Sequence, residues 1–171
     1  MVTPYFALMA LVGLERVAEL VVSRRNAAWS LARGGVERGA EHYPVMVVLH
    51  TAFLIGCVVE GSQRAFTPAL GWPMLALVVA AQALRWWVIT TLGPRWNTRV
   101  IVVPGLPLVT GGPFRYLRHP NYLAVVVEGF ALPLVHGAWI TALVFSLANA
   151  WLLWVRIGVE NRALGHGQTT R

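Results

Sequence analysis

Five apolar stretches, separated by arginine-bearing connections, constrain this sequence more than any other feature. They cover residues 2–22, 43–59, 68–92, 122–135 and 138–155. A helix rises 1.5 Å per residue, so about 20 residues cross a hydrocarbon core of about 30 Å. The first and third stretches reach that length, the second and fifth are marginal, and the fourth is short. The pattern predicts an all-α integral membrane protein with about five transmembrane helices. The fourth either begins deep in the bilayer or forms a tight hairpin with the fifth that crosses only partly.

The composition agrees with one membrane domain. Only 12% of the 171 residues are charged, against about 25% in soluble domains. We expect a single domain over 1–171, in which 1–92 form a three-helix scaffold and 93–171 form a cofactor-binding loop and a helical hairpin. The first stretch has no basic segment before it and no small-residue cleavage site, so we expect it to be retained.

The charged residues narrow the range of function classes. Every basic residue is Arg, and the chain has neither Lys nor Asp; guanidinium groups stay protonated and bind carboxylate or phosphate in a forked geometry. The arginines lie between apolar stretches instead of covering one soluble face, so no nucleic-acid partner is expected. One cysteine, Cys57, gives no disulfide framework, and without clustered Cys or His no metal site is expected.

Arginine placement predicts the orientation in the membrane. The connections 23–42 and 93–120 carry four Arg each, whereas the connections between the second and third and between the fourth and fifth stretches carry one and none. Cytoplasmic loops are the arginine-rich ones. We therefore expect both rich connections and the C-terminal tail, with Arg162 and Arg171, to be cytoplasmic and the N-terminus to be outside.

The connection 93–120 is long for so small a protein, and such loops are usually functional or disordered. It contains Trp96, the apolar tetrad 100–103, and Pro104, Gly105 and Pro107. This content favours an ordered, partly buried loop that acts as a lid or cofactor cradle between the third and fourth helices. The tetrad is also suited to a short strand.

The end of that connection, 111–122, holds the densest group of aromatic, cationic, imidazole and amide side chains. Pro120 suits the first turn of a helix, which places His119 and Asn121 at a helix N-terminus, where N–H groups and the helix dipole attract an anion. An interfacial anchor, in which these side chains hold the helix among lipid headgroups, is an equally good interpretation.

A second polar group lies at the end of the fifth stretch. Arg156 and Glu160 are four residues apart and share a helix face, and Asn149 lies two turns earlier on the same stripe. A polar stripe on a membrane helix faces protein or a cavity rather than lipid. The alternative is a structural ion pair at the membrane interface.

Ionisable and amide side chains also interrupt the apolar stretches: Glu15, Arg16, Glu19, His50, Gln82, Arg85 and Glu128. Glu15 and Glu19 share a helix face, and either can pair with Arg16 or Arg85. Buried charges in a bilayer are costly and therefore usually partnered, so a polar network that locks the bundle is favoured over a functional site. Glu128 is the member that we expect to touch a substrate cavity.

These motifs together resemble the isoprenylcysteine carboxyl methyltransferase family. They are Gly112-Pro113-Phe114, the run 118–122 (Arg-His-Pro-Asn-Tyr) and the later Arg156-x-x-x-Glu160. The resemblance covers about 93–164, and the N-terminal part, with Glu15-Arg16 and His42-Tyr43, is similar to a short bacterial branch associated with O-methylation of lipophilic polyketides such as alkylpyrones and alkylresorcinols. Family members are membrane enzymes that use S-adenosylmethionine without a Rossmann domain, and the Gly-x-Gly-x-x-Gly pattern is absent here.

The resemblance implies a cofactor site, with the backbone of 106–109 around the adenosine part. Its members would be Arg99, Leu106, Pro107, Leu108, Val109, Phe114, His119, Pro120, Asn121, Tyr122 and Glu160. Phe114 stands where the family often has Tyr, so a hydroxyl hydrogen bond is lost there. Arg156 and Glu160 would be the catalytic pair, and Arg156 and Glu128 would bind the acceptor.

The chemistry of methyl transfer suits this set of residues. Transfer from a sulfonium to an oxygen anion neutralises two charges, so alignment and removal of water supply much of the acceleration. A carboxylate acceptor is already ionised at neutral pH, whereas a phenol, with a pKa of about 10, needs a base or a nearby cation. Arg156 is the candidate cation, and Glu160 or His119 the candidate base.

The sequence therefore predicts an S-adenosylmethionine-dependent O-methyltransferase acting on a lipophilic acceptor dissolved in the membrane, such as a polyketide-type phenol or pyrone, with membrane lipids as its surroundings. Carboxyl methylation of a prenylcysteine-like or other lipid carboxylate is the alternative within this class. A non-enzymatic bundle or transporter that uses the network of Glu15, Arg16 and Arg85, and a membrane reductase of the sterol type, are alternatives outside it. The sequence does not indicate an oligomeric state.

Overall fold

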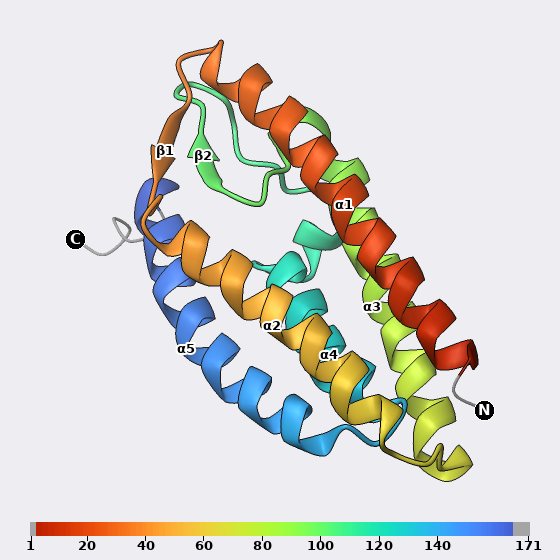
Figure 1. Cartoon of the computed structure of the whole chain (residues 1–171). Coiled ribbons are helices and arrows are strands. Elements are labelled where there is room, and N and C mark those ends of the chain that lie inside the picture. The colour runs from red at the N-terminus through yellow and green to blue at the C-terminus, as the bar shows by residue number, and fades with distance from the viewer. Residues whose placement is uncertain (1–2, 166–171) are drawn as a thin grey trace.

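Five α-helices and a two-stranded sheet make up the described part of the computed structural model, residues 3–165 (Figure 1). Val2 and Arg171, which entered the predictions above, lie outside the described residues. Two short 3₁₀ helices interrupt the long connection before α4. In chain order the elements are α1 (Thr3–Leu31), β1 (Val36–Arg38), α2 (His42–Ser62), α3 (Pro68–Leu92), η1 (Gly93–Arg95), β2 (Val100–Val102), η2 (Gly112–Arg115), α4 (Pro120–Leu134) and α5 (Trp139–Ala163).

Three helices in the described range are long and apolar enough to cross a membrane: His42–Ser62, Pro68–Arg95 and Trp139–Ala163. The predicted all-helical class is thus confirmed, and three of the about five predicted spans have the length and composition to cross a membrane. The fourth helix is short, as predicted, with 15 residues. Helix α1 has 29 residues, but Glu15, Arg16 and Glu19 interrupt its apolar character.

Two helices extend by two turns or more beyond the apolar stretches that predicted them. Helix α1 continues nine residues past position 22, to Leu31, and α5 continues eight past position 155, to Ala163. The extension of α1 is held by polar contacts that hydropathy does not detect: Asn26 Nδ2 donates to the Trp96 carbonyl at 2.7 Å, and Ser23 Oγ donates to Asn97 Oδ1 at 2.8 Å. The apolar pattern thus marked the apolar part of each helix rather than its end.

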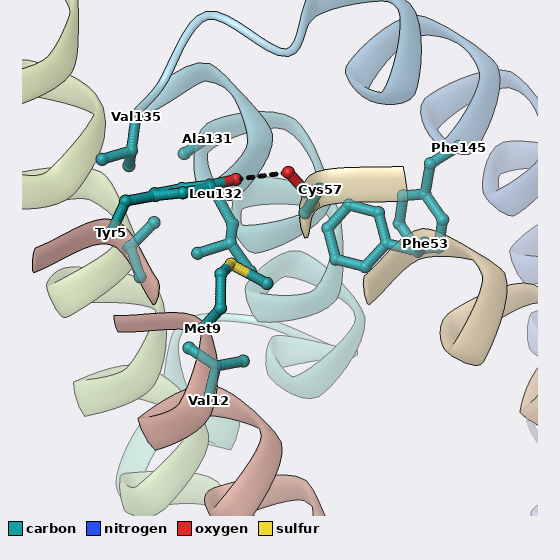
Figure 2. Packing of buried hydrophobic residues seen from close by; sticks show 10 residues of the cluster. Tyr5, Met9, Val12, Phe53, Cys57, Ala131, Leu132, Val135 and Phe145 are labelled. Carbon is teal, nitrogen blue, oxygen red and sulfur yellow. Dashed lines mark hydrogen bonds between the residues drawn. The ribbon is translucent and has the colours of Figure 1, made fainter. Parts of the chain in front are cut away.

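At the end of the bundle away from the sheet, an apolar cluster joins all five helices (Figure 2). The hydroxyl of Tyr5 donates to the carbonyl of Cys57 at 2.9 Å, and the rings of Phe53 and Phe145 lie with their centroids 4.1 Å apart. Gly61 is required beside Tyr5, because a Cβ at that position would lie 2.5 Å from the Tyr5 ring. This cluster closes one end of the bundle.

At the opposite end, the sheet ties the two arginine-rich connections together. Strands β1 and β2 pair antiparallel, with Val36 opposite Val102 and Arg38 opposite Val100. The strand predicted as one alternative for the tetrad 100–103 is therefore present. The pairing anchors the long connection 93–120 to the connection between α1 and α2, above the open end of the bundle (Figure 1).

The charged residues that interrupt the apolar stretches form one network between α1, α3 and α4. Glu19 accepts from Arg16 at 2.7 Å and lies 3.4 Å from Nε of Arg85. Glu128 pairs with Arg85 and lies 3.0 Å from Arg16. Each carboxylate therefore bridges two guanidinium groups, which is how buried charges are tolerated in a bilayer. The arrangement agrees with a network that locks the bundle.

Candidate active site

A cavity of about 480 Å³ opens between the helices at the sheet end of the bundle. Small-molecule sites measure about 300–1,000 Å³, so the cavity has the size of a ligand site. All five helices and the connection 93–120 contribute to its lining. The lining residues come from positions as far apart in the chain as Arg16 and Leu164.

The N-terminus of α4 forms part of the wall. Pro120 occupies the first helical turn as predicted, and His119 is the N-cap residue. The N–H groups of Tyr122 and Leu123 both donate to the His119 carbonyl, at 3.1 and 3.2 Å. Two first-turn donors are thus already bonded, so anion binding at this terminus would depend on the side chains more than on the helix backbone.

The start of α4 is joined to the end of α5 by two side-chain contacts. The hydroxyl of Tyr122 donates to Oε2 of Glu160 at 2.5 Å, and Nε2 of His119 lies 3.1 Å from Oδ1 of Asn161. Nδ1 of His119 is 3.6 Å from Oε1 of Glu160, an ion-pair distance. The Glu160 carboxylate raises the pKa of His119 above its ordinary value. The start of α4 and the end of α5, which the resemblance assigns to one cofactor site, are therefore in contact.

Arg156 links α5 to the long connection. Its side chain is buried, at 7% exposure, and Nη2 donates to the Thr98 carbonyl at 2.8 Å. That bond uses one of the five guanidinium N–H groups. Since Arg156 also lines the cavity, it presents positive charge to a ligand from a fixed position.

The connection forms the opposite wall. Arg99 is held by Glu37, with Nη1 3.2 Å from Oε2, and by the ring of Tyr43, whose centroid is 4.6 Å from its guanidinium carbon. The segment 106–109 follows, and the carbonyl of Pro107 accepts from Arg95 at 2.6 Å. This wall is built from backbone and from side chains anchored outside the cavity.

Eleven predicted cofactor residues and Arg156 all line this cavity: Arg99, Leu106, Pro107, Leu108, Val109, Phe114, His119, Pro120, Asn121, Tyr122, Arg156 and Glu160. Glu128 is placed differently. Within residues 3–165 it lines a small adjoining cavity of about 30 Å³ and is bonded to Arg85 and Arg16. Its two guanidinium partners, rather than Glu128 itself, face the larger cavity.

The sequence of this chain matches a known protein family and two bacterial relatives. The model of the isoprenylcysteine carboxyl methyltransferase (ICMT) family matches residues 74–166, more than half of the chain. The chain belongs to this family. A Bacillus subtilis (strain 168) relative, "Uncharacterized protein YpbQ", is 36% identical over 94% of this chain and 96% of its own length. An "Uncharacterized protein" of Haemophilus influenzae (strain ATCC 51907 / DSM 11121 / KW20 / Rd) is 29% identical over 88% of this chain and 89% of its own. No solved structure matches.

Membership settles the broad class. The ICMT family consists of membrane methyltransferases that generally use S-adenosylmethionine. Together with three helices of membrane-spanning length and composition in the described range, it identifies the chain as an integral membrane protein of a methyltransferase family. The match includes every predicted site residue from Arg99 to Glu160.

The cavity offers polar atoms that suit such a cofactor. Trp96 is 2% exposed, and its Nε1 is a buried donor without a hydrogen-bond partner among residues 3–165. Oδ1 of Asn121 is a buried acceptor that is likewise unbonded within the described chain. S-adenosylmethionine carries an adenine, a ribose and an amino-acid group, all of which hydrogen bond. The residues present therefore fit the group.

Sequence reasoning missed several lining residues. Asn97 and Thr98 lie in the connection shortly after η1, and Asn161 adjoins Glu160. The short polar run after Trp96 was a usable signal for Asn97 and Thr98. No sequence signal pointed to Asn161, because its place in the site depends on a contact with His119, which is 42 residues away in the chain.

Proposed function

We propose that this ICMT-family protein is an S-adenosylmethionine-dependent O-methyltransferase that acts on a lipophilic acceptor dissolved in the membrane, with a polyketide-type phenol or pyrone as the preferred class. The supporting observation is that one cavity combines the polar cluster of His119, Tyr122 and Glu160 with a buried guanidinium, that of Arg156, and with apolar walls. A polar donor site and an apolar acceptor site thus share one space.

The residues of α4, α5 and the connection would hold the cofactor. When bound, S-adenosylmethionine supplies a methyl group on a positively charged sulfur. Glu160, held by Tyr122, would bind the cationic amine, while Asn121 and Trp96 would bond its remaining polar groups. The segment 106–109 would lie against the adenosine part. These contacts would fix the direction of the methyl group, and orientation is a large part of such catalysis.

Arg156 would face the acceptor oxygen. A guanidinium beside a phenol favours the ionised form, because an opposite charge stabilises the anion. Burial of Arg156 strengthens this effect, since fewer waters screen the charge. The acceptor would lie against Leu152 and Leu153, which line the cavity between Arg156 and the interior of the bundle. Apolar walls exclude the water that would otherwise solvate the nucleophile.

The proposal is tested with purified protein in detergent. Labelled methyl transfer from S-adenosylmethionine to a lipid extract is measured alongside the cofactor-induced shift in thermal unfolding. We expect both transfer and an upward shift. Absence of methyl transfer together with absence of a cofactor-induced shift in thermal unfolding would refute the proposal.

The same products separate the two acceptor classes. A methylated phenol is an aryl ether and survives mild alkali, whereas a methylated carboxylate is an ester and releases methanol. Alkali-stable label supports the phenol or pyrone. Alkali-labile label supports carboxyl methylation of a prenylcysteine-like or other lipid acid instead.

We further propose that all five helices lie in the membrane, with the N-terminus outside and the sheet end in the cytoplasm. Both arginine-rich connections lie at the sheet end of the bundle, which supports this orientation. Intact cells carrying Gln63→Cys or Ala40→Cys are treated with a membrane-impermeant maleimide. Only Gln63→Cys should react before permeabilisation, and the reverse pattern would invert the topology.

A further inference from the structure

The cavity continues past the proposed cofactor site into the bundle. Each helix has one lining residue farthest from the sheet end, and together these form what we call the floor: Arg16, Leu54, Arg85, Val125 and Asn149. The assignment follows from chain direction, because α1, α3 and α5 end at the sheet end while α2 and α4 begin there. The floor is therefore the innermost level of the cavity.

Asn149 is the polar floor residue that lacks a fixed partner. It is 2% exposed, and its Oδ1 is bonded to no atom among residues 3–165. A buried amide oxygen left unbonded costs about 1–3 kcal/mol, and this one lies in the wall of a cavity. A ligand that donates a hydrogen bond at this position would remove that cost.

The other polar floor groups are occupied by carboxylates. Arg16 pairs with Glu19 and Glu128, and Arg85 pairs with the same two residues. Glu15 lies 3.7 Å from Arg16 and adds a third carboxylate. Three carboxylates against two guanidinium groups leave a formal charge of −1, from −3 + 2. The negative charge of this network disfavours an anionic ligand group at the floor, whereas a neutral hydrogen-bond donor is compatible with it.

The floor is separated from Arg156 by a fixed length of helix. Asn149 and Arg156 are seven residues apart on α5, which is about 10 Å along the axis. Leu152 and Leu153 line the cavity between them, at 1% and 8% exposure. Two polar positions are thus joined by an apolar interval about as long as an aromatic ring with a short chain.

We propose that the floor is a second polar subsite, in which Asn149 accepts a hydrogen bond from a neutral hydroxyl group at the end of the acceptor opposite its reacting oxygen. The acceptor is then a molecule with two oxygen functions across an apolar body, rather than a lipid with one polar head. This inference rests on the proposed methyltransferase function, because Arg156 marks the reacting end. Asn149 is a positioning and specificity residue.

Three matched probes test the subsite: para-(hydroxypropyl)phenol, para-butylphenol and para-hydroxyphenylpropanoate. They share a phenol and a similar length, and differ at the far end in a hydroxyl, a methyl or a carboxylate. Their binding to purified protein in detergent is measured by titration calorimetry with and without S-adenosylmethionine, and methyl transfer is measured in parallel. One hydrogen bond to the floor should favour the hydroxyl probe over the butyl probe about tenfold, with the carboxylate probe weakest.

Variants assign the preference to Asn149. Asn149→Leu should abolish it, so that the butyl probe binds as well as the hydroxyl probe or better. Ser146→Ala, which removes a hydroxyl from α5 outside the cavity lining, should keep the wild-type ratio. Asn149→Ala provides the same comparison if the Leu variant does not fold.

The outcomes are separable from the proposed function. Equal affinity of the hydroxyl and butyl probes for the wild-type protein, absence of binding by both, or a ratio that survives in both Asn149 variants overturns the subsite. Loss of the cofactor-induced shift, with no methyl transfer to any acceptor, overturns the methyltransferase proposal. A tenfold binding preference that depends on Asn149 supports the subsite, whether or not the phenol probes are turned over.

Discussion

Replacing Glu160 with Gln isolates its charge. Its Oε2 accepts from Tyr122 at 2.5 Å, and its Oε1 lies 3.6 Å from Nδ1 of His119. Gln keeps an acceptor oxygen for Tyr122 and nearly the same shape, so the substitution removes the negative charge with little change in packing. The side chain is 29% exposed, and a partly exposed pair contributes about 0–1 kcal/mol to folding. The folded state should survive.

Cofactor binding should respond far more strongly. A hydrogen bond to a charged group contributes about 1.5–3 kcal/mol, and every 1.4 kcal/mol is about tenfold in affinity. If Glu160 binds the cofactor amine, Glu160→Gln should raise the Kd for S-adenosylmethionine about 10- to 150-fold. Exposure of 29% lets water screen part of this charge, so the lower half of the range is expected.

Titration calorimetry in detergent measures the Kd, and thermal unfolding without cofactor checks the fold. Glu41→Gln is the matched control, because the Glu41 side chain is 73% exposed at the start of α2; its Kd should equal that of the wild type. An unchanged Kd in a folded Glu160→Gln protein would refute the assignment. Equal losses in both variants would show that the effect is one of net charge.

Three further perturbations address the scaffold and the pH dependence. Gly61→Ala places a Cβ 2.5 Å from the Tyr5 ring, so thermal unfolding should show a loss of about 1–3 kcal/mol. The pKa of His119 is raised by Glu160, so its stabilising effect is complete below the unfolded pKa of about 6.5 and is lost as pH rises through the folded pKa. The difference in melting temperature between wild type and His119→Gln should therefore shrink from about pH 6 to pH 9. Arg85→Gln leaves three carboxylates with one guanidinium and should cost about 3–5 kcal/mol in chemical unfolding.

Each of these has a control within the chain. Gly13 has no atom within 4 Å of an added Cβ among the described residues, so Gly13→Ala should be neutral or stabilising; equal losses at both glycines would contradict the close-packing argument. Glu128→Gln balances the network at two charges of each sign and should cost less than Arg85→Gln. A larger cost for Glu128→Gln would contradict the charge count. A difference in melting temperature between wild type and His119→Gln that grows with pH would contradict the pairing of His119 with Glu160.

The sequence predicted the helical class well, because long apolar stretches leave few alternatives. Pro120 placed the start of α4, and the short fourth stretch gave a short helix. Shared helix faces also anticipated the network, in which Glu19 pairs with both Arg16 and Arg85. Periodicity and length are local properties, so they can be read from the sequence.

The remainder depends on contacts between distant segments. The end of α1 was missed, because hydropathy does not detect Asn26 bonded to the Trp96 carbonyl. The polar stripe predicted that Asn149 faces inward, but the pairing of His119 with Asn161 requires the packed bundle. Family resemblance supplied the residues of the cavity wall, whereas its floor became visible only when all five helices were in place.

The three-residue pairing of β1 with β2 has a consequence for biogenesis. Val36 meets Val102 only after α2 and α3 have been synthesised and placed in the membrane, and the Thr98 carbonyl receives its bond from Arg156 only after α5 follows. The binding loop is therefore completed at the end of translation. If the proposed function holds, a defect in helix insertion would be observed first as a newly made protein that does not bind S-adenosylmethionine, while its helix content is still nearly normal.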